Sequence, residues 1–410
     1  MTSAGITFFF NWEVALEEWL QSVLGNFGIS VISFFSAFGE ELLLIGVMGF
    51  LYWCWDKKFG KFVAANFMVA ALLNPMIKNI VHRRRPYFDN EGIKCLRAVD
   101  SEADIYDIAA QGYSFPSGHS SASASMYGSI AAYIKKKWAV ILAAVIIVLV
   151  GFSRITVGVH YPTDVICGWA LGIAAVLFVP WLQKKINNDP LFYAILLIAG
   201  LPGFFYCRTE DFFSSYGMML GTFSGILFEE KYVKFDNTRN VIRIILRLAA
   251  GVGLFFGLNS LLKLPFSKEF LESGTMMVLI IRAIRYAVVT FILIGIYPII
   301  FKYTAKIGSK QEAQEESTNP AENEAPAPED RENEQAVEEA EGKELIAEIK
   351  AESTEEFRTA AQGDTISDFV SLNPDTPDPN ASRMTEEYIE WMQAQRQSEE
   401  ECETSQSENQ

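Results

Sequence analysis

Three short patterns of basic, histidine and small polar residues carry the chemistry that this sequence offers. They are K-x-x-x-x-x-x-R-P at residues 78–86, P-S-G-H at residues 116–119, and S-R-x-x-x-x-x-H-x-x-x-D at residues 153–164. The chain contains only three histidines, and two of them, His119 and His160, hold specified positions in these patterns. Fixed cations, a backbone anion site and two imidazoles are the groups that cleavage of a phosphate ester without a metal requires.

The first pattern places two cations at the end of a predicted helix. Lys78 and Arg85 are seven residues apart, close to two helical turns and about 10 Å of rise, so both can project from one face. Pro86 then ends the helix. By itself, this spacing is more typical of a solvated helix face. Arg83 and Arg84 occupy unspecified positions within the pattern and need either an anionic partner or lipid headgroups around their charges.

The second pattern predicts an anion site at the N-terminus of a helix, where free backbone N–H groups favour negative charge. Pro116 and Gly118 precede a run of serine and alanine, which we interpret as a closely packed helix. Ser117 offers a hydroxyl donor, Gly118 allows close approach of the backbone, and His119 can donate a proton to a leaving oxygen. Taken alone, the pattern is more typical of an ordinary helix cap with a hydrogen-bonded histidine.

The third pattern joins the end of one apolar stretch to the start of the next. Arg154, which follows Ser153, presents a planar fork of donors to phosphate oxygens. Asp164 lies four residues after His160 and can accept a hydrogen bond from one ring nitrogen, leaving the other as an oriented nucleophile. The alternative is that Asp164 caps a helix while Arg154 and His160 lie at a membrane interface.

The elements that must position these residues are long apolar stretches, which recur through the first 300 residues. Stretches of roughly 17–25 residues are long enough to cross a bilayer. Runs such as residues 138–150 have no polar side, which argues against a soluble fold. We therefore expect an all-α, polytopic membrane bundle of about nine spans, near residues 40–55, 61–78, 118–134, 138–153, 164–183, 191–207, 212–228, 240–262 and 275–301.

Charge is divided unevenly along the chain and predicts its orientation. Residues 311–410 contain 29 acidic and 6 basic residues, so residues 1–310 carry a formal charge of +7 although the whole chain has −16. Basic clusters occur at alternate turns between spans, which places these turns and the acidic tail in the cytoplasm. Two spans separate the loop between the first two patterns from the third pattern. An even number of crossings returns all three patterns to one face, which is the outer one.

The sequence divides into four predicted parts. In residues 1–38, apolar residues such as Trp12 and Trp19 repeat at helical spacing opposite Glu13 and Glu17, which predicts an amphipathic helix in the membrane interface. The remaining parts are a catalytic membrane core, additional spans and a disordered acidic tail, at residues 39–183, 184–302 and 303–410.

The eleven specified residues, taken in order, resemble the type 2 phosphatidic acid phosphatase superfamily over about residues 40–183. The resemblance implies that His160 attacks phosphorus to form a phosphohistidine, that Asp164 orients His160, and that His119 protonates the leaving group and then activates water. It also implies that no metal or other cofactor is needed. The residues that would hold the phosphate oxygens are Lys78, Arg85, Ser117, Gly118 through its backbone, and Arg154.

The expected function is that of a metal-independent phosphatase acting on a lipid phosphate or diphosphate at the outer face of a bacterial cell membrane. Expected partners are the phosphorylated lipid, membrane lipids and a basic cytoplasmic partner of the tail, with plain solvation of the tail as the alternative; no nucleic acid is expected. Two other functions remain open, a lipid phosphoryl or headgroup transferase and a non-enzymatic lipid-phosphate-binding scaffold. Paired histidines also predict a bell-shaped pH dependence of turnover.

Overall fold

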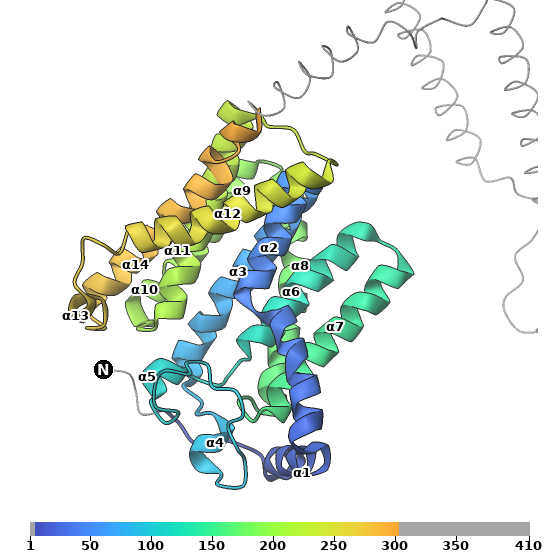
Figure 1. Cartoon of the computed structure of the whole chain (residues 1–410), viewed down its shortest axis with the longest axis vertical. Coiled ribbons are helices and arrows are strands. Elements are labelled where there is room, and N and C mark those ends of the chain that lie inside the picture. The colour runs from blue at the N-terminus through green and yellow to red at the C-terminus, as the bar shows by residue number, and fades with distance from the viewer. Residues whose placement is uncertain (1–4, 303–410) are drawn as a thin grey trace, which may run out of the picture. The chain divides into compact units, whose positions relative to one another are not determined.

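The computed structural model describes residues 5–302, and this part of the chain is built from helices (Figure 1). Within it, the nearest approach to a sheet is one isolated bridge between Ile6 and Arg83. The helices are α1 (Asn11–Phe34), α2 (Glu41–Phe50), α3 (Lys57–Val81), α4 (Pro86–Asp89), α5 (Ile108–Gln111), α6 (Gly118–Ile134), α7 (Lys137–Thr156), α8 (Pro162–Ile186), α9 (Asp189–Gly200), α10 (Gly203–Tyr206), α11 (Glu210–Phe228), α12 (Val241–Leu261), α13 (Lys268–Leu271) and α14 (Met276–Phe291).

Each of the nine apolar stretches forms a helix, which confirms the all-α class. The stretch at residues 40–55 forms α2 and a π-helical turn at Leu51–Trp55, and the last stretch forms α14 and a second π-helical turn at Ile292–Ile296. The number of membrane crossings stays a prediction. Seven helical segments within residues 5–302 are long and apolar enough to cross a membrane: Asn11–Gly39, Lys57–Val81, Lys137–Thr156, Pro162–Ile186, Asp189–Tyr206, Val241–Leu261 and Met276–Lys302.

The N-terminal helix α1 turns its polar side into the protein. It bends at Gly25, whose φ of 58° is a left-handed conformation that glycine adopts readily. Before the bend α1 lies across one end of the bundle, and after it the helix runs along the bundle (Figure 1). Trp12 and Trp19 are exposed, whereas Glu13 and Glu17 are fully buried. A helix therefore forms where the amphipathic pattern predicts one, and its two glutamates are buried in the protein interior. Its place in the membrane interface stays a prediction.

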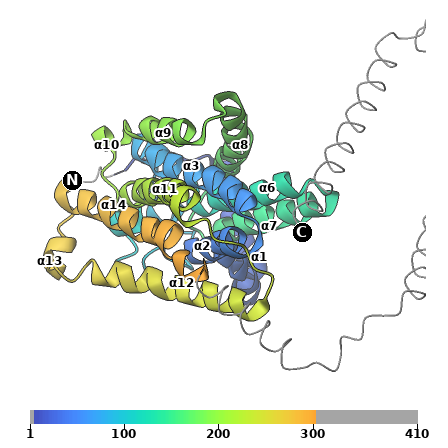
Figure 2. The ribbon, with the colours of Figure 1, turned by 90° about the horizontal axis from the view of Figure 1, so that it is seen from above.

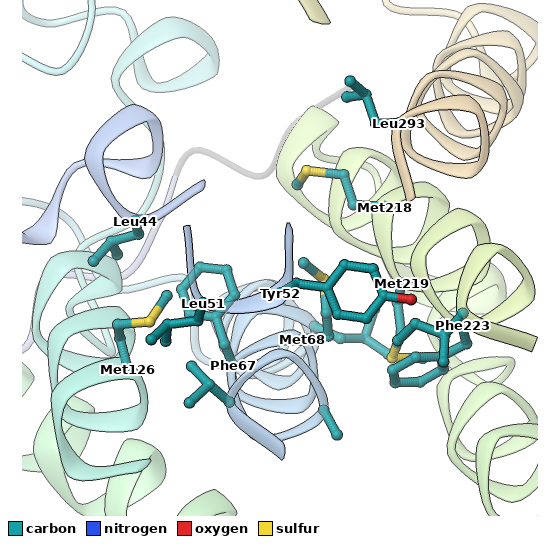
Figure 3. Packing of buried hydrophobic residues seen from close by; sticks show 14 of the residues in the cluster. Leu44, Leu51, Tyr52, Phe67, Met68, Met126, Met218, Met219, Phe223 and Leu293 are labelled. Carbon is teal, nitrogen blue, oxygen red and sulfur yellow. The ribbon is translucent and has the colours of Figure 1, made fainter. Parts of the chain in front are cut away.

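Helix α3 lies at the centre of the bundle and packs against α6, α8 and α11 (Figure 2). Figure 3 shows Phe67 and Met68 of α3 between Met126 of α6 on one side and Met219 and Phe223 of α11 on the other. These side chains are buried and join the two halves of the bundle in one core. The carboxyl end of α3, which carries Lys78, is thereby fixed relative to both halves.

Close packing of α6 on α8 fixes the second pattern against the third. A Cβ atom at Gly168 of α8 would lie 2.7 Å from the Ser117 carbonyl oxygen, and one at Gly172 would lie 2.6 Å from the Ser121 carbonyl oxygen. Only glycine at these positions lets the two helices approach so closely. The serine and alanine run of α6 is therefore a packing surface, as its composition predicts.

Two further points concern the acidic tail and a pair of cysteines. The acidic tail at residues 303–410, with its expected disorder and its cytoplasmic partner, lies outside the described residues. Cys95 and Cys207 are both free thiols.

Candidate active site

Backbone hydrogen bonds join the three patterns at one end of the bundle. The Ser114 N–H donates to the carbonyl oxygen of Arg83 at 2.8 Å, which ties the approach to the second pattern to the first. The Ser117 N–H donates to the carbonyl oxygen of Asp164 at 3.0 Å, which ties the second pattern to the third. These two main-chain contacts join residues 31 and 47 positions apart in sequence, so the side chains of the three patterns have fixed relative positions.

A cavity of about 190 Å³ lies where the patterns meet. Two of the eight predicted site residues, Ser117 and Asp164, are fully buried directly behind its wall. The structure therefore places all eight at one location. The six that line the cavity are Lys78, Arg85, Gly118, His119, Arg154 and His160.

The two ring nitrogens of His160 face different groups. Its Nδ1 lies 3.6 Å from Asp164 Oδ2 and 3.5 Å from Ser114 Oγ, and its Nε2 lies 3.5 Å from Arg85 Nη1. Because an arginine can only donate, Nε2 next to it carries a lone pair and Nδ1 carries the proton. The Ser114 hydroxyl donates to Asp164 Oδ2. Asp164 therefore lies on the predicted side of the ring, in contact with Ser114, and its distance from Nδ1 is longer than a hydrogen bond.

The surroundings of His160 keep its ring neutral. The side chain is almost fully buried. Burial, and then the nearby cations Arg85, Arg154 and Lys78, lower the pKa of His160 well below the usual imidazole value. A neutral imidazole with its Nε2 lone pair toward the cavity has the form that a nucleophile needs.

Asp164 is held by a buried ion-pair chain that begins in α1. Arg83 Nη1 donates to Asp164 Oδ1 at 2.6 Å, and Arg83 Nη2 donates to Glu13 Oε2 at 2.8 Å. The Arg83 guanidinium also lies 4.1 Å from the ring centre of Tyr161. The sequence left two explanations for the charge of Arg83, an anionic partner or lipid headgroups. Its contacts with Glu13 and Asp164 support the anionic partner. Arg84 pairs with Asp89 at 3.1 Å.

Arg85 and Arg154 differ from Arg83 because no carboxylate among residues 5–302 lies within ion-pair distance of either one. Arg85 Nε donates to the carbonyl oxygen of Gln111 at 2.9 Å. Arg154 Nη1 donates to Ser36 Oγ at 3.1 Å, and its Nε has no hydrogen-bond partner. Both side chains are about 2% exposed. A buried charge without a counterion is costly, so these two guanidinium groups favour an anion in the cavity they line.

The N-terminus of α6 presents its backbone to the same cavity. Ser117 caps the helix by accepting a hydrogen bond from the Ser120 N–H. A Cβ atom at Gly118 would lie 3.6 Å from Asn74 Oδ1 and 3.9 Å from Lys78 Nζ, so glycine leaves this space open beside the cation. The ring of His119 packs on Gly39, where a Cβ atom would lie 3.1 Å from His119 Cδ2. The ring is thereby fixed at the cavity wall.

Sequence reasoning missed several residues that act around this cavity. Asn74 lies one helical turn before Lys78 and donates to the Pro116 carbonyl at 3.2 Å, so its spacing was a usable signal. Asp211 lies 3.9 Å from Lys78 Nζ and comes from α11, far along the chain, where no pattern indicates it. Ser114, two residues before the second pattern, and Arg83, two residues before Arg85, are the partners of Asp164.

Comparison with known families defines the class of protein that this fold and site belong to. Residues 60–188 match the model of the PAP2 superfamily, and residues 213–309 match that of the PAP2 superfamily phosphatase transmembrane extension. The chain belongs to the PAP2 superfamily. It is an integral membrane phosphatase, and the type 2 phosphatidic acid phosphatase resemblance is confirmed.

The chain is also similar to individual proteins of known name. The chain is 32% identical to phosphatidylglycerophosphatase B of Bacillus subtilis over 42% of its own length and 79% of that protein. It is 31% identical to an undecaprenyl-diphosphatase of Sulfolobus acidocaldarius, over 34% of the chain and 63% of that protein. It is 28% identical to the bacitracin transport permease protein BcrC of Bacillus licheniformis, over 38% of the chain and 72% of that protein. Among solved structures no match was found.

Proposed function

We propose that the protein hydrolyses a lipid phosphate or lipid diphosphate through a phosphohistidine at His160, without a metal, at the outer face of a bacterial cell membrane. The observation that carries the proposal is the convergence of two imidazoles and three cations on one cavity. Two of those cations, Arg85 and Arg154, lack a carboxylate partner in the described part of the chain.

In the proposed reaction, His160 Nε2 attacks phosphorus as the bond from phosphorus to the leaving oxygen breaks. His119 gives its proton to that oxygen, and the lipid alcohol or lipid phosphate departs. His119 then takes a proton from water, whose oxygen attacks the phosphohistidine, and inorganic phosphate and neutral His160 result. Asp164, with Ser114, stabilises the Nδ1 proton throughout.

Cations stabilise the charge that develops on the phosphate oxygens. Arg85 and Arg154 offer planar donor forks, and Lys78 offers a point charge beside the backbone of Gly118. Ser117 acts through the cap of α6, because its side chain is buried behind the wall. This arrangement favours a trigonal-bipyramidal phosphoryl group with oxygens on several sides.

An apolar wall next to the cations supports a lipid substrate. The cavity is also lined by Phe67, Ala71 and Met218. Ala71 lies seven residues before Lys78 on α3, about 10 Å toward the middle of the bundle. A volume of about 190 Å³ is smaller than sites that enclose whole drug-sized ligands, so it suits a headgroup whose chains remain in the bilayer. The names of two relatives, a phosphatidylglycerophosphatase and an undecaprenyl-diphosphatase, point to the same class of substrate.

The test uses the full-length chain in detergent with a chelator present. A panel of phosphatidic acid, phosphatidylglycerol phosphate and an isoprenoid diphosphate is offered to the wild type and to His160→Ala. We expect phosphate release by the wild type alone, and equal release by the two proteins would refute the assignment. A new phosphorylated product that forms only when an alcohol acceptor is added would instead identify a transferase.

The proposed face of the membrane is tested separately. Lys94, exposed in the loop between α4 and α5, and Lys184, at the end of α8, are each replaced by cysteine in a cysteine-free chain. A membrane-impermeant maleimide added to intact cells is expected to label position 94 and to leave position 184 unlabelled. The reverse pattern would place the cavity on the cytoplasmic side.

A further inference from the structure

A second cavity, of about 490 Å³, lies between α11, α14 and the connection at residues 262–275. It lies across α11 from the candidate active site, because Asp211 lines the first cavity and its neighbour Glu210 lines the second. Neither histidine of the motifs lines it. The basic residues that line it are Lys263, Lys268, Arg282 and Arg285.

Two of these four cations form ion pairs with carboxylates, and two do not. Arg282 pairs with Glu210, and Lys268 lies 3.7 Å from Glu272. For Lys263 and Arg285, no carboxylate in the described part of the chain lies within ion-pair distance. The second cavity therefore carries an excess of positive charge, as the candidate active site does.

Arg285 is the residue that points most clearly to an anion in the second cavity. It is 6% exposed, and its Nε has no hydrogen-bond partner. It lies nine residues into α14, about 14 Å along an apolar helix. A buried arginine at such a depth is costly, and in membrane helices such residues mark ligand or ion sites. Arg282, one turn earlier on the same face of α14, donates from Nε to Ser214 Oγ of α11 at 2.9 Å and so anchors the wall.

Lys263 completes the cluster from the connecting segment. Partial burial, and then the cations Arg285 and Arg282, lower the pKa of Lys263, while Glu210 opposes them. Mutual repulsion of this kind is relieved by an anion bound among the three cations. A planar guanidinium with an unused Nε donor suits the oxygens of a phosphate group.

We propose that this cavity is a second binding site for a phosphate-bearing anion, built by the transmembrane extension and separate from the candidate active site. A lipid headgroup and free inorganic phosphate offer the same chemistry to Arg285 and Lys263. The two sources are distinguished by the experiment below.

Binding is measured on the full-length chain in detergent, in an Arg85→Gln background that weakens the first site. Inorganic phosphate is titrated by calorimetry, and phosphatidic acid retention is followed by native mass spectrometry with phosphatidylcholine as the reference lipid. Lys263→Gln is expected to weaken binding about tenfold, a change that one charge-assisted contact can supply. Lys94→Gln removes the same charge from an exposed loop position and is expected to leave binding unchanged.

Arg285→Lys keeps the charge but loses the donor fork, and we expect it to weaken binding less than Lys263→Gln combined with Arg285→Lys. Retention of phosphatidic acid without binding of inorganic phosphate assigns a lipid headgroup, and the opposite result assigns the free ion. Equal binding by the Lys263→Gln and Lys94→Gln proteins for both ligands would overturn the proposal. Lys263 is only partly buried and keeps a large exposed fraction, so we expect Lys263→Gln to fold normally, and the thermal midpoint checks this.

Discussion

Lys57 at the start of α3 and Arg85 just beyond its end are held in opposite ways. Lys57 and Lys78 are separated by 21 residues, about 32 Å along the helix. At the first end, Lys57 Nζ lies 2.7 Å from Glu229 Oε1, and Glu229 also accepts hydrogen bonds from Tyr52 and the Phe235 N–H. Near the other end, Lys78 Nζ lies 3.9 Å from the exposed Asp211. Arg85, four residues beyond the helix, is held by backbone carbonyls and lacks a carboxylate within the described residues.

The comparison distinguishes a basic residue that stabilises the fold from one that can bind an anionic ligand. A lysine paired with a buried glutamate stabilises the fold and offers little to an anion. An arginine held only by neutral carbonyls keeps its full positive charge. An anion bound in the cavity would therefore be its counterion. We therefore expect substitutions at the two ends to affect different quantities.

The largest expected effect is the loss of the nucleophile at the cavity end. His160→Ala should lower kcat for phosphate release on the order of 10⁴-fold, because it removes the proposed nucleophile. The measurement is phosphate release with a purified lipid phosphate, with the thermal midpoint as a check on folding. A variant that keeps more than about a tenth of the activity would remove His160 from the mechanism.

Replacing one cation at each end tests the comparison directly. Arg85→Gln should lower kcat/KM by about 10²–10³-fold with little change in stability, because a donor to the transition state is lost. Lys57→Gln should lower the free energy of unfolding by about 1–3 kcal/mol, because Glu229 loses a partner, and should leave the activity of the folded protein unchanged. Steady-state kinetics and chemical denaturation measure the two quantities. If both variants lost activity equally, the distinction between the two ends would be wrong.

Substitution of Arg83 should affect both stability and activity, because Arg83 is buried, ion-paired and next to Asp164. Arg83→Gln leaves Glu13 and Asp164 without their cation, and breaking a buried pair in this way costs about 3–5 kcal/mol of stability. Adding Glu13→Gln should restore part of that stability in a double-mutant cycle. Full additivity of the two substitutions would show that Glu13 and Arg83 are not coupled.

A smaller effect is expected at Gly118. A methyl group there would lie 3.6 Å from Asn74 Oδ1 and 3.9 Å from Lys78 Nζ, so Gly118→Ala should crowd an anion next to Lys78 without disturbing the helix. We expect inhibition by inorganic phosphate to weaken by less than about tenfold, or about 1.4 kcal/mol. Gly128→Ala, farther along α6, is the matched control, since a Cβ atom there would lie 3.4 Å from one side-chain atom of Val176. Equal inhibition of the two variants would contradict the proposed approach of phosphate to Gly118.

The smallest effect concerns pH. Burial and the surrounding cations lower the pKa of His160, and the attacking ring must be neutral, so the acid limb of kcat/KM should lie below the usual imidazole pKa of about 6.5. Arg85→Gln removes one cation and should move this limb toward higher pH. The profile from about pH 4 to 9 should remain bell-shaped, because the acid His119 must lose its proton at the other limb. An acid limb that stays in place in Arg85→Gln would show that Arg85 does not act on His160.

Much of the fold and the composition of the site follow from local sequence. Apolar stretches of helical length gave all nine predicted helices, because burial of apolar side chains and internal backbone hydrogen bonding act along one segment. Counting crossings also put the three patterns at one end. The buried face of α1 was harder to foresee, because Glu13 and Glu17 look like a water-facing stripe until Arg83 and the rest of the interior are placed against them.

The sequence by itself determined which chemical groups are present: two imidazoles, the cations of the first and third patterns, and a glycine at a helix N-terminus. Tertiary structure alone decided how each charge is used. Arg83 and Arg85 are two residues apart, yet one is neutralised by Glu13 and Asp164, which lie 70 and 81 residues away, and the other faces the cavity without a carboxylate. The physical reason is that the free energy of a charge depends on its burial and its partners, and segments remote in sequence supply both.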